Sequence, residues 1–189
     1  MKIVEIQKTI LLVALICLAS TINAQSYNDQ VSDILVQDFL YSYLNDYSKT
    51  KSYRSDKKII IDITPMHFEN PDSLLKNIHN WNKLLDCLSF NLDSLLNDSD
   101  KSFIVAQIKS QKDFTWGITH PKFSFGKIKE PSWTDFYYRL SMPIFSKSRD
   151  VAIIMKIRKC GFDCGDLMIS VYKKKKNKWI LMAGWGYVT

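Results

Sequence analysis

The chain has 189 residues, a net charge of +7 and only six glycines. This length suits one domain with a single sizeable core. The glycines form neither a G-x-G-x-x-G nor a G-x-x-x-x-G-K pattern, which excludes the usual nucleotide-binding loops, and a mildly basic charge alone specifies no partner.

The N-terminus has the pattern of a secretory signal peptide. Lys2 and Lys8 flank a short polar head, and an unbroken apolar run of ten residues follows at Ile10–Ala19. Such a run is too short to span a bilayer, which takes about 20 residues. Ala24 offers a small residue at a cleavage point, so we expect residues 1–24 to be removed.

Residues 25–189 would then form one exported domain, secreted or periplasmic, of 165 residues. The signal segment carries two lysines and one glutamate, so the net charge falls from +7 to +6. No second apolar run approaches spanning length, and we expect no membrane span after signal removal.

The first half of this domain predicts amphipathic helices around one strand. We expect a helix from Asp29 to about Tyr47 and a second over residues 70–88, where Asn70 caps the first turn and Pro71 suits its first position. The first helix would bury Val31, Ile34, Leu35, Phe39, Tyr43 and Leu44. Between the helices, the β-branched run 58–64 predicts a strand, and residues 99–110 favour a helix over a strand.

The second half alternates apolar and polar residues between turns, which is typical of strands. We expect strands over residues 136–144, 151–160, 164–174 and 178–187, the first of them edge-lying or bulged at Pro143. The predicted fold class is α+β, with N-terminal helices packed on a C-terminal antiparallel meander.

The stretch KCGFDCGD, residues 159–166, predicts a hairpin tip that brings Cys160 and Cys164 together. In that register Ile157 meets Leu167 and one face of the hairpin is continuously apolar, whereas a one-residue slip mixes the faces. Export favours oxidation, so we expect a Cys160–Cys164 disulfide that stabilises by about 2 kcal/mol.

Other chemistry for these cysteines is less well supported. A redox pair usually has C-x-x-C spacing at a helix N-terminus, and here the spacing is one residue longer and lies between strands. Cys87 would be a free buried thiol or an alternative disulfide partner. His67, His79 and His120 lack ligand spacing, so we expect no metal and no cofactor.

The densest charge in the chain is the run that ends in the last predicted turn. We interpret it either as a solvated turn or as a surface for an anionic glycan or lipid, whereas nucleic acid is less favoured. The surface would consist of Lys173, Lys174, Lys175, Lys176 and Lys178. Several aromatic residues fill the core or form a stacking platform, namely Trp116, Trp133, Trp179, Trp185, Tyr137 and Tyr138.

No nucleophile motif or paired carboxylate pattern is present, so the sequence favours a non-catalytic binding or envelope-associated protein over an enzyme. One alternative is a small hydrolase with a site assembled from scattered residues, such as His120 or His67 beside a carboxylate or hydroxyl. The other is a thiol-disulfide exchange protein that uses Cys160 or Cys164.

The last 50 or so residues resemble a group of small exported bacterial proteins without known function. The likeness is carried by MPIFSKSRDVAII (142–154), KCGFDCGDL (159–167) and NKWILMAGW (177–185). The resemblance implies a C-terminal Cys-Gly hairpin and no catalytic residues. The order of helices before a meander also resembles cystatin-like and nuclear-transport-factor-like folds, an analogy that does not fix function.

Overall fold

The computed structural model describes residues 27–49, 59–67, 92–128, 136–160 and 164–188. These residues form an α+β fold, as predicted, with one seven-stranded sheet, two α-helices and one short 3-10 helix. The expected helix over residues 70–88, Cys87 and Trp133 lie outside the described residues. In the part of the chain that is described, no helix has the length and apolar character needed to cross a membrane.

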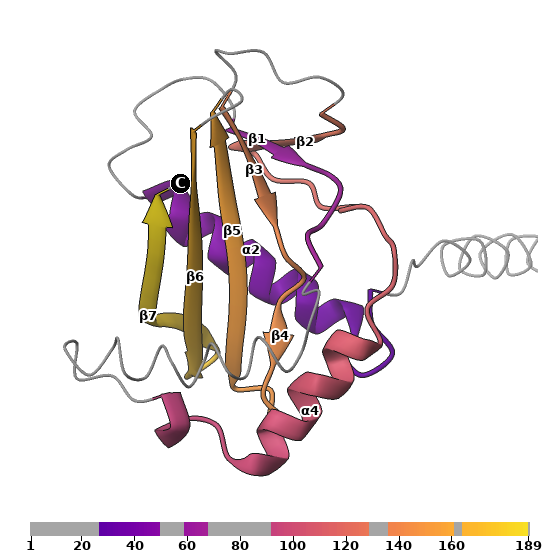
Figure 1. Ribbon diagram of the computed structural model, residues 1–189, viewed down its shortest axis with the longest axis vertical. Coiled ribbons are helices and arrows are strands. Elements are labelled where there is room, and N and C mark those ends of the chain that lie inside the picture. Colours follow the sequence, from indigo (N-terminus) through magenta and orange to yellow (C-terminus); the bar gives the residue numbers. More distant parts are fainter. Residues whose placement is uncertain (1–26, 50–58, 68–91, 129–135, 161–163, 189) are drawn as a thin grey trace, which may run out of the picture.

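Helix α2 (Asp33–Lys49) lies across one face of the sheet, behind β5 and β6 in Figure 1. It begins at Asp33 and not at Asp29, directly after Ser32, whose carbonyl accepts from the amides of Leu35 and Val36. Its buried stripe consists of Val36, Phe39, Leu40, Tyr43 and Leu44. The expectation that Ile34 is buried was wrong, because the stripe turns that side chain away from the sheet and leaves it 80% exposed.

Helix α4 (Asp98–Lys109) confirms the helical interpretation of this region. Its N-terminus is fixed by a capping box, in which the Asn97 side chain accepts from the Asp100 amide and the Asp100 carboxylate accepts from the Asn97 amide. The box gives hydrogen-bond acceptors to two main-chain amides at the start of the helix, which have no partner within the helix itself. This favours a helix over a strand for the apolar run that follows. A 3-10 helix, η2 (Leu92–Ser94), precedes it.

The sheet has the strand order β2-β1-β3-β5-β6-β7, and β4 pairs with β5 outside this path. Strand β1 is parallel to both of its neighbours, and the remaining pairs are antiparallel. The strands are β1 (Ile59–Asp62), β2 (Phe123–Gly126), β3 (Phe136–Leu140), β4 (Ile144–Phe145), β5 (Val151–Cys160), β6 (Cys164–Lys175) and β7 (Lys178–Val188).

The C-terminal meander was predicted correctly, but the first strand differs. The expected strand over residues 136–144 is broken into β3 and β4, with Met142 and Pro143 between them. Proline donates no ladder hydrogen bond, so the break falls where the sequence places it. Strand β3 is not at the edge of the sheet, because its other side pairs with β1.

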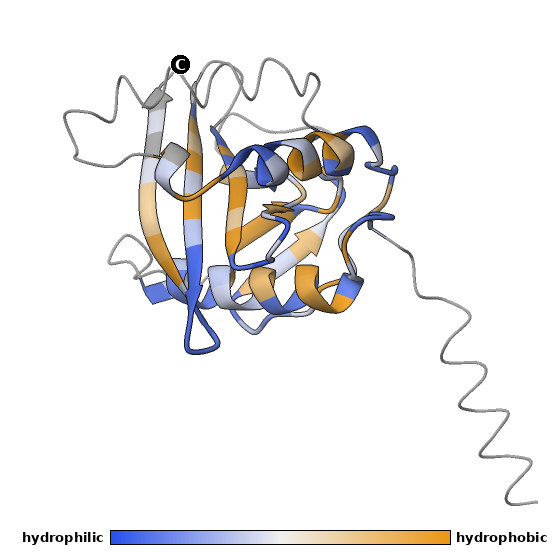
Figure 2. Ribbon diagram, turned by 90° about the horizontal axis from the view of Figure 1, so that it is seen from below, coloured by the Kyte–Doolittle hydropathy of each residue, from blue (hydrophilic) through white to orange (hydrophobic). Residues whose placement is uncertain are grey.

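Alternate side chains of β5 point to opposite faces of the sheet and pack into two separate hydrophobic clusters. Ala152 and Ile154 point toward α2 and join one apolar cluster, whereas Val151 and Ile153 point to the opposite face and join a second cluster with Ile104 of α4. Figures 1 and 2 show the two helices on opposite sides of the sheet. Both faces of the first half of β5 are therefore buried, which explains the apolar run with which the strand begins.

Candidate functional site

The β5–β6 hairpin brings the two C-terminal cysteines opposite each other. Cys160 and Cys164 are Cα partners, and the same register sets Ile157 opposite Leu167, as the sequence predicted. Directly opposite residues have Cα atoms within the range that a disulfide spans. The backbone therefore permits the disulfide, and the bond itself stays a prediction.

The lysine run forms the last turn of the sheet. Lys176 and Asn177 make a two-residue turn with positive φ values of 47° and 61°, the conformation typical of tight hairpins. Lys175 and Lys178 are directly opposite each other in the last rung. Figure 2 shows this hydrophilic tip projecting from the body of the molecule.

Strand alternation divides the lysines between two faces. Lys174 pairs with Trp179 on the α2 face, where its Nζ lies 3.1 Å from Asp38 Oδ2 and 5.3 Å from the indole ring. Lys173, Lys175 and Lys178 share the opposite face, because directly opposite residues point to the same side. Lys174 therefore serves an internal contact, and the other four lysines of the predicted surface lie at or near the exposed tip.

The β4–β5 turn lies beside this tip. The Lys174 amide donates to the Asp150 carbonyl at 2.6 Å, and exposed Arg149 precedes Asp150 with a φ of 62°. The hydrogen bond from the Ser148 hydroxyl is the main cause that lowers the pKa of Asp150, and Lys173 adds a smaller effect in the same direction. The hydroxyls of Ser146 and Ser148 thus hold the Asp150 carboxylate within its turn, beside the cationic tip.

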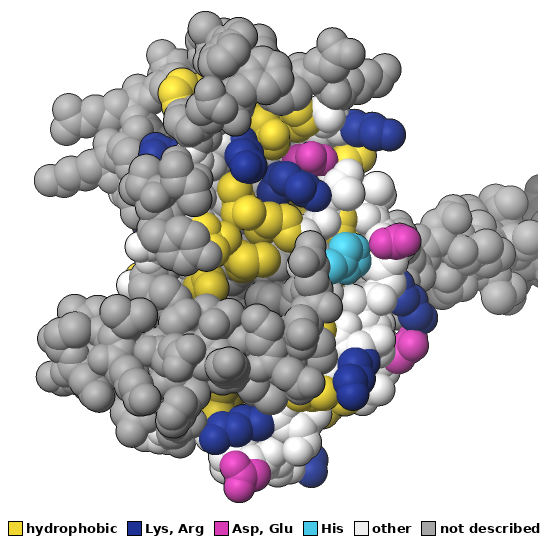
Figure 3. Space-filling view, viewed as in Figure 1, with side chains coloured by type: hydrophobic (Ala, Val, Ile, Leu, Met, Phe, Trp, Pro, Cys, Tyr) yellow, Lys and Arg dark blue, Asp and Glu magenta, His cyan; other side chains and the backbone are white. Residues whose placement is uncertain are grey.

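The face of the sheet opposite α2 has a mixed character. Figure 3 shows hydrophobic side chains reaching the surface there, with Lys and Arg side chains spread around them. Met155 and Leu167 are half-buried on this face, and Arg139 Nε lies 3.8 Å from Asp62 Oδ2. The two signs of charge are interspersed, so this face differs from the lysine tip.

His67 has a carboxylate partner but not the setting of a catalytic base. Its Nε2 lies 3.4 Å from Asp113 Oδ1 and its Nδ1 lies 3.2 Å from Gln111 Oε1. The Asp113 side chain is fully exposed, so it cannot hold the ring as a buried carboxylate does. Within the described residues His67 has no hydroxyl partner, and this arrangement gives a hydrolase little support.

His120 is buried and its hydrogen bonds fix its tautomer. The Lys122 amide donates to Nδ1 at 3.2 Å, so Nε2 carries the proton and donates to Asn45 Oδ1, also at 3.2 Å. Burial, followed by the charge of Lys122, lowers the pKa of His120. Both ring nitrogens are occupied, which suits a structural role and not proton transfer to a substrate.

Of the two interpretations of the aromatic residues, three of the residues confirm the core. Trp116, Trp179 and Tyr138 are buried in the cluster beneath α2, where Trp179 packs edge-on against Phe39 at 5.1 Å between ring centroids. Tyr137 is half-buried, and the side chain of Trp185 lies outside the described part. Trp116, Trp179 and Tyr138 therefore belong to the core and are not available for stacking with a ligand.

Sequence reasoning missed a buried lysine in β5. Lys156 is only 6% exposed, and its Nζ lies 3.9 Å from the centroid of Tyr47 and 5.6 Å from that of Tyr138. Burial is the main cause that lowers the pKa of Lys156 to about 8, partly opposed by Asp166. The available signal was a lysine inside the otherwise apolar run of residues 151–157.

Metal ligands are not gathered anywhere in the described residues, which contain no group of three or more His, Cys, Asp or Glu side chains suited to a cation. No family model, curated protein or solved structure matches the chain.

Proposed function

We propose that the protein is an exported, non-catalytic binding domain whose β6–β7 tip contacts an anionic glycan or lipid surface. The observation that carries this proposal is the rung in which Lys175 and Lys178 are directly opposite each other. Like charges directly opposite each other destabilise a hairpin, and an anion at the tip would relieve the repulsion.

Further cations beside the tip support the proposed binding surface. Lys173 lies two residues from Lys175 on the same face, and Arg149 of the adjacent turn is also exposed. A projecting tip brings several cations to one surface without burying them, which suits a partner that carries repeated negative charges.

Export is part of the proposal and rests on the N-terminal sequence. The positively charged head, the run of ten apolar residues and Ala24 support cleavage of residues 1–24 and a secreted or periplasmic location. We further propose that Cys160 and Cys164 form a disulfide there, supported by their opposite positions. Intact mass before and after reduction tests both, because cleavage and oxidation each change the mass by a known amount.

The finer fold assignment is likewise a proposal. A long helix across one face of a sheet that ends in three consecutive antiparallel strands supports a cystatin-like or nuclear-transport-factor-like fold. The resemblance to small exported bacterial proteins with a Cys-Gly hairpin is also a proposal.

Two double variants of equal charge test the binding surface. Lys175→Ser with Lys178→Ser removes two cations from the tip, and Lys109→Ser with Lys127→Ser removes two exposed cations elsewhere. We expect the tip variant to bind heparin beads or phosphatidylglycerol vesicles about tenfold more weakly at low salt, and the control to bind nearly as the native protein does.

The two probes separate the partner classes. If the tip variant loses binding to heparin alone, the partner is a glycan. If it loses binding to vesicles alone, the partner is a lipid headgroup. If both double variants bind more weakly to the same extent, net charge alone explains the binding. If the tip variant is retained as well as the native protein, the tip is not the binding surface.

A further inference from the structure

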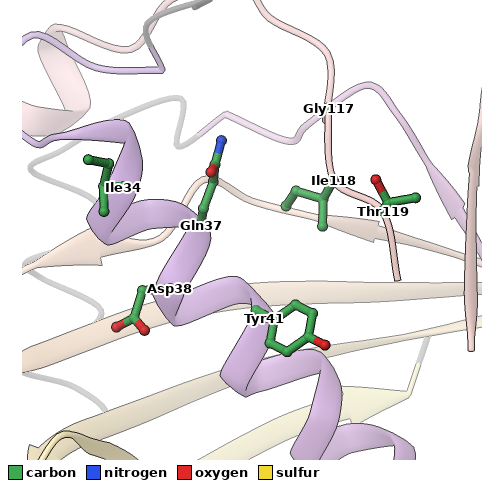
Figure 4. Close-up of a pocket in the computed structure, with 7 residues that line it drawn as sticks. All are labelled: Ile34, Gln37, Asp38, Tyr41, Gly117, Ile118 and Thr119. Carbon is green, nitrogen blue, oxygen red and sulfur yellow. The ribbon is translucent and has the colours of Figure 1, made fainter. Parts of the chain in front are cut away.

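A groove of about 510 Å³ lies between the outer side of α2 and an extended segment that precedes β2. Figure 4 shows the residues that line it, which come from the helix and from the extended segment. The helix contributes residues at positions i, i+3, i+4 and i+7, which share one side of a helix. The lining residues are Ile34, Gln37, Asp38, Tyr41, Gly117, Ile118 and Thr119.

The segment on the far wall has strand character, and among the described residues it has no strand partner on the groove side. Burial alternates along it, with Phe114 and Trp116 buried and Thr115 and Gly117 exposed. The Trp116 amide donates to the Ile63 carbonyl at 2.9 Å. Within the described part of the chain, the main-chain groups of residues 117–119 form no hydrogen bond, so the segment presents free donors and acceptors as a sheet edge does.

The helical wall is apolar where it meets this edge. Ile34 is 80% exposed and Tyr41 is 51% exposed, although both are large hydrophobic residues. The Tyr41 ring lies 5.4 Å from the ring of His120, whose two nitrogens are held by Asn45 and Lys122. The wall is therefore already ordered, which lowers the entropy cost of binding.

Asp38 gives the groove a negative charge at one point. Its Oδ2 accepts from Lys174 Nζ and from Trp179 Nε1, and its side chain is still 54% exposed. It is the only charged residue among the lining residues. Lys174 offsets part of this charge, and the exposed remainder of the carboxylate suits a neutral or basic ligand better than an acidic one.

The lengths of the two walls match. Ile34 and Tyr41 are seven residues apart, which corresponds to about 10 Å along a helix. Three extended residues also span about 10 Å, the length of the unpaired stretch 117–119. We propose that the groove binds an extended peptide segment, neutral or basic, whose main chain pairs with residues 117–119 and whose apolar side chain packs between Ile34 and Tyr41.

Gly117 offers a way to close the groove without disturbing the fold. A Cβ atom added there would meet only Tyr27 Oη at 3.9 Å, an ordinary contact. Gly126 of β2 is a matched control, because an added Cβ meets nothing within 4 Å and the residue does not line the groove. Gly117→Val and Gly126→Val therefore make the same change inside and outside the proposed site.

The probe is a phage-displayed library of random heptapeptides, panned on the purified protein and counter-selected on Gly117→Val. An enriched peptide is then synthesised with blocked ends and titrated by calorimetry. We expect Gly117→Val to weaken binding at least about tenfold and Gly126→Val to change it less than about twofold. The melting temperatures of both variants check that each is folded.

N-methylation of the peptide, one residue at a time, tests main-chain pairing. In an extended pairing alternate amides face the partner, so we expect a period of two, with about tenfold losses at the paired positions. The groove is not a peptide site if no peptide is enriched over the counter-selection, if both valine variants bind alike, or if the N-methyl series lacks this period. Binding of cellobiose or chitobiose that Gly117→Val abolishes, without any peptide binding, would assign the groove to a sugar and overturn the proposal.

Discussion

Gln107 holds Phe145 by two reciprocal hydrogen bonds that imitate a rung of a sheet. Its Oε1 accepts from the Phe145 amide at 2.9 Å and its Nε2 donates to the Phe145 carbonyl at 2.6 Å. The glutamine side chain is completely buried. Helix α4 is thereby joined to β4, the short strand that follows Pro143.

We expect Gln107→Leu to lower the free energy of unfolding by about 2 to 4 kcal/mol, because it leaves two buried main-chain groups without partners. Urea denaturation measures the change. Gln30→Leu is the control, since Gln30 is exposed and should shift the midpoint very little. A Gln107→Leu protein as stable as the native one would show that α4 is held by apolar packing alone.

Lys156 makes a second prediction, about alkaline pH. Its folded pKa of about 8 lies below the unfolded value of about 10.4. Between these values the unfolded chain binds more protons than the folded protein, so the free energy of unfolding rises with pH. The full rise would be at most about 3 kcal/mol.

The Lys156→Met variant should lack this rise from pH 7.5 to about 9.5, as measured by urea titration at each pH. At pH 7 the variant should be about 1 kcal/mol more stable, because the loss of two cation–π contacts, about 0.5 to 2 kcal/mol, is smaller than the desolvation penalty that is removed. Lys109→Met, an exposed control, should keep the rise. The pH range stops at about 9.5 because burial raises the pKa of Tyr172 in the folded protein. Tyrosine in the unfolded chain ionises first, at about pH 10, and above that pH the free energy of unfolding falls as the pH rises.

His120 predicts an effect on the acid side. Its folded pKa is lowered, so the unfolded chain takes up its proton first as the pH falls below about 6.5. The free energy of unfolding should therefore decrease from that pH downward, and His120→Gln should decrease less. Nitrogen-15 NMR should show the Nε2–H tautomer at pH 7, and an Nδ1–H tautomer would contradict the hydrogen bonds to Lys122 and Asn45.

Local patterns were sufficient for the C-terminal hairpins. Cys160 and Cys164 are four residues apart, and only one register keeps Ile157 and Leu167 on a common apolar face, so the pairing follows from side chains close in sequence. The helix expected over residues 99–110 is also present, but it begins at Asp98, and the capping box of Asn97 and Asp100 that fixes its start was not anticipated.

Long-range relationships were not predictable in this way. Strand β2 has only four residues and lies parallel to β1, with a long stretch of chain between them and no turn to set the register. The burial of Ile34 was predicted wrongly because several adjacent residues of the first helical turn are apolar, and the sequence does not show which of them faces the core. The groove followed from neither segment alone, since it exists only where α2 meets residues 117–119.

The two glycines of β7 give a prediction about how closely β6 and β7 approach. A Cβ atom added at Gly186 would collide with the Leu167 carbonyl oxygen, whereas one added at Gly184 would lie 2.9 Å from the terminal methyl of Met168. Main-chain atoms of a central strand cannot move aside without breaking the ladder, but the end of a methionine side chain can rotate.

We therefore expect Gly186→Ala to cost about 2 kcal/mol or more of unfolding free energy and Gly184→Ala less than about 1 kcal/mol. Thermal denaturation of both variants gives the comparison. Hydrogen exchange should place the loss in β7, because it is the last strand of the sheet and only one side of it is paired within the described residues. Equal costs for the two alanines would mean that β7 moves as a unit away from β6, and that the close approach at Leu167 is not a fixed property of this edge.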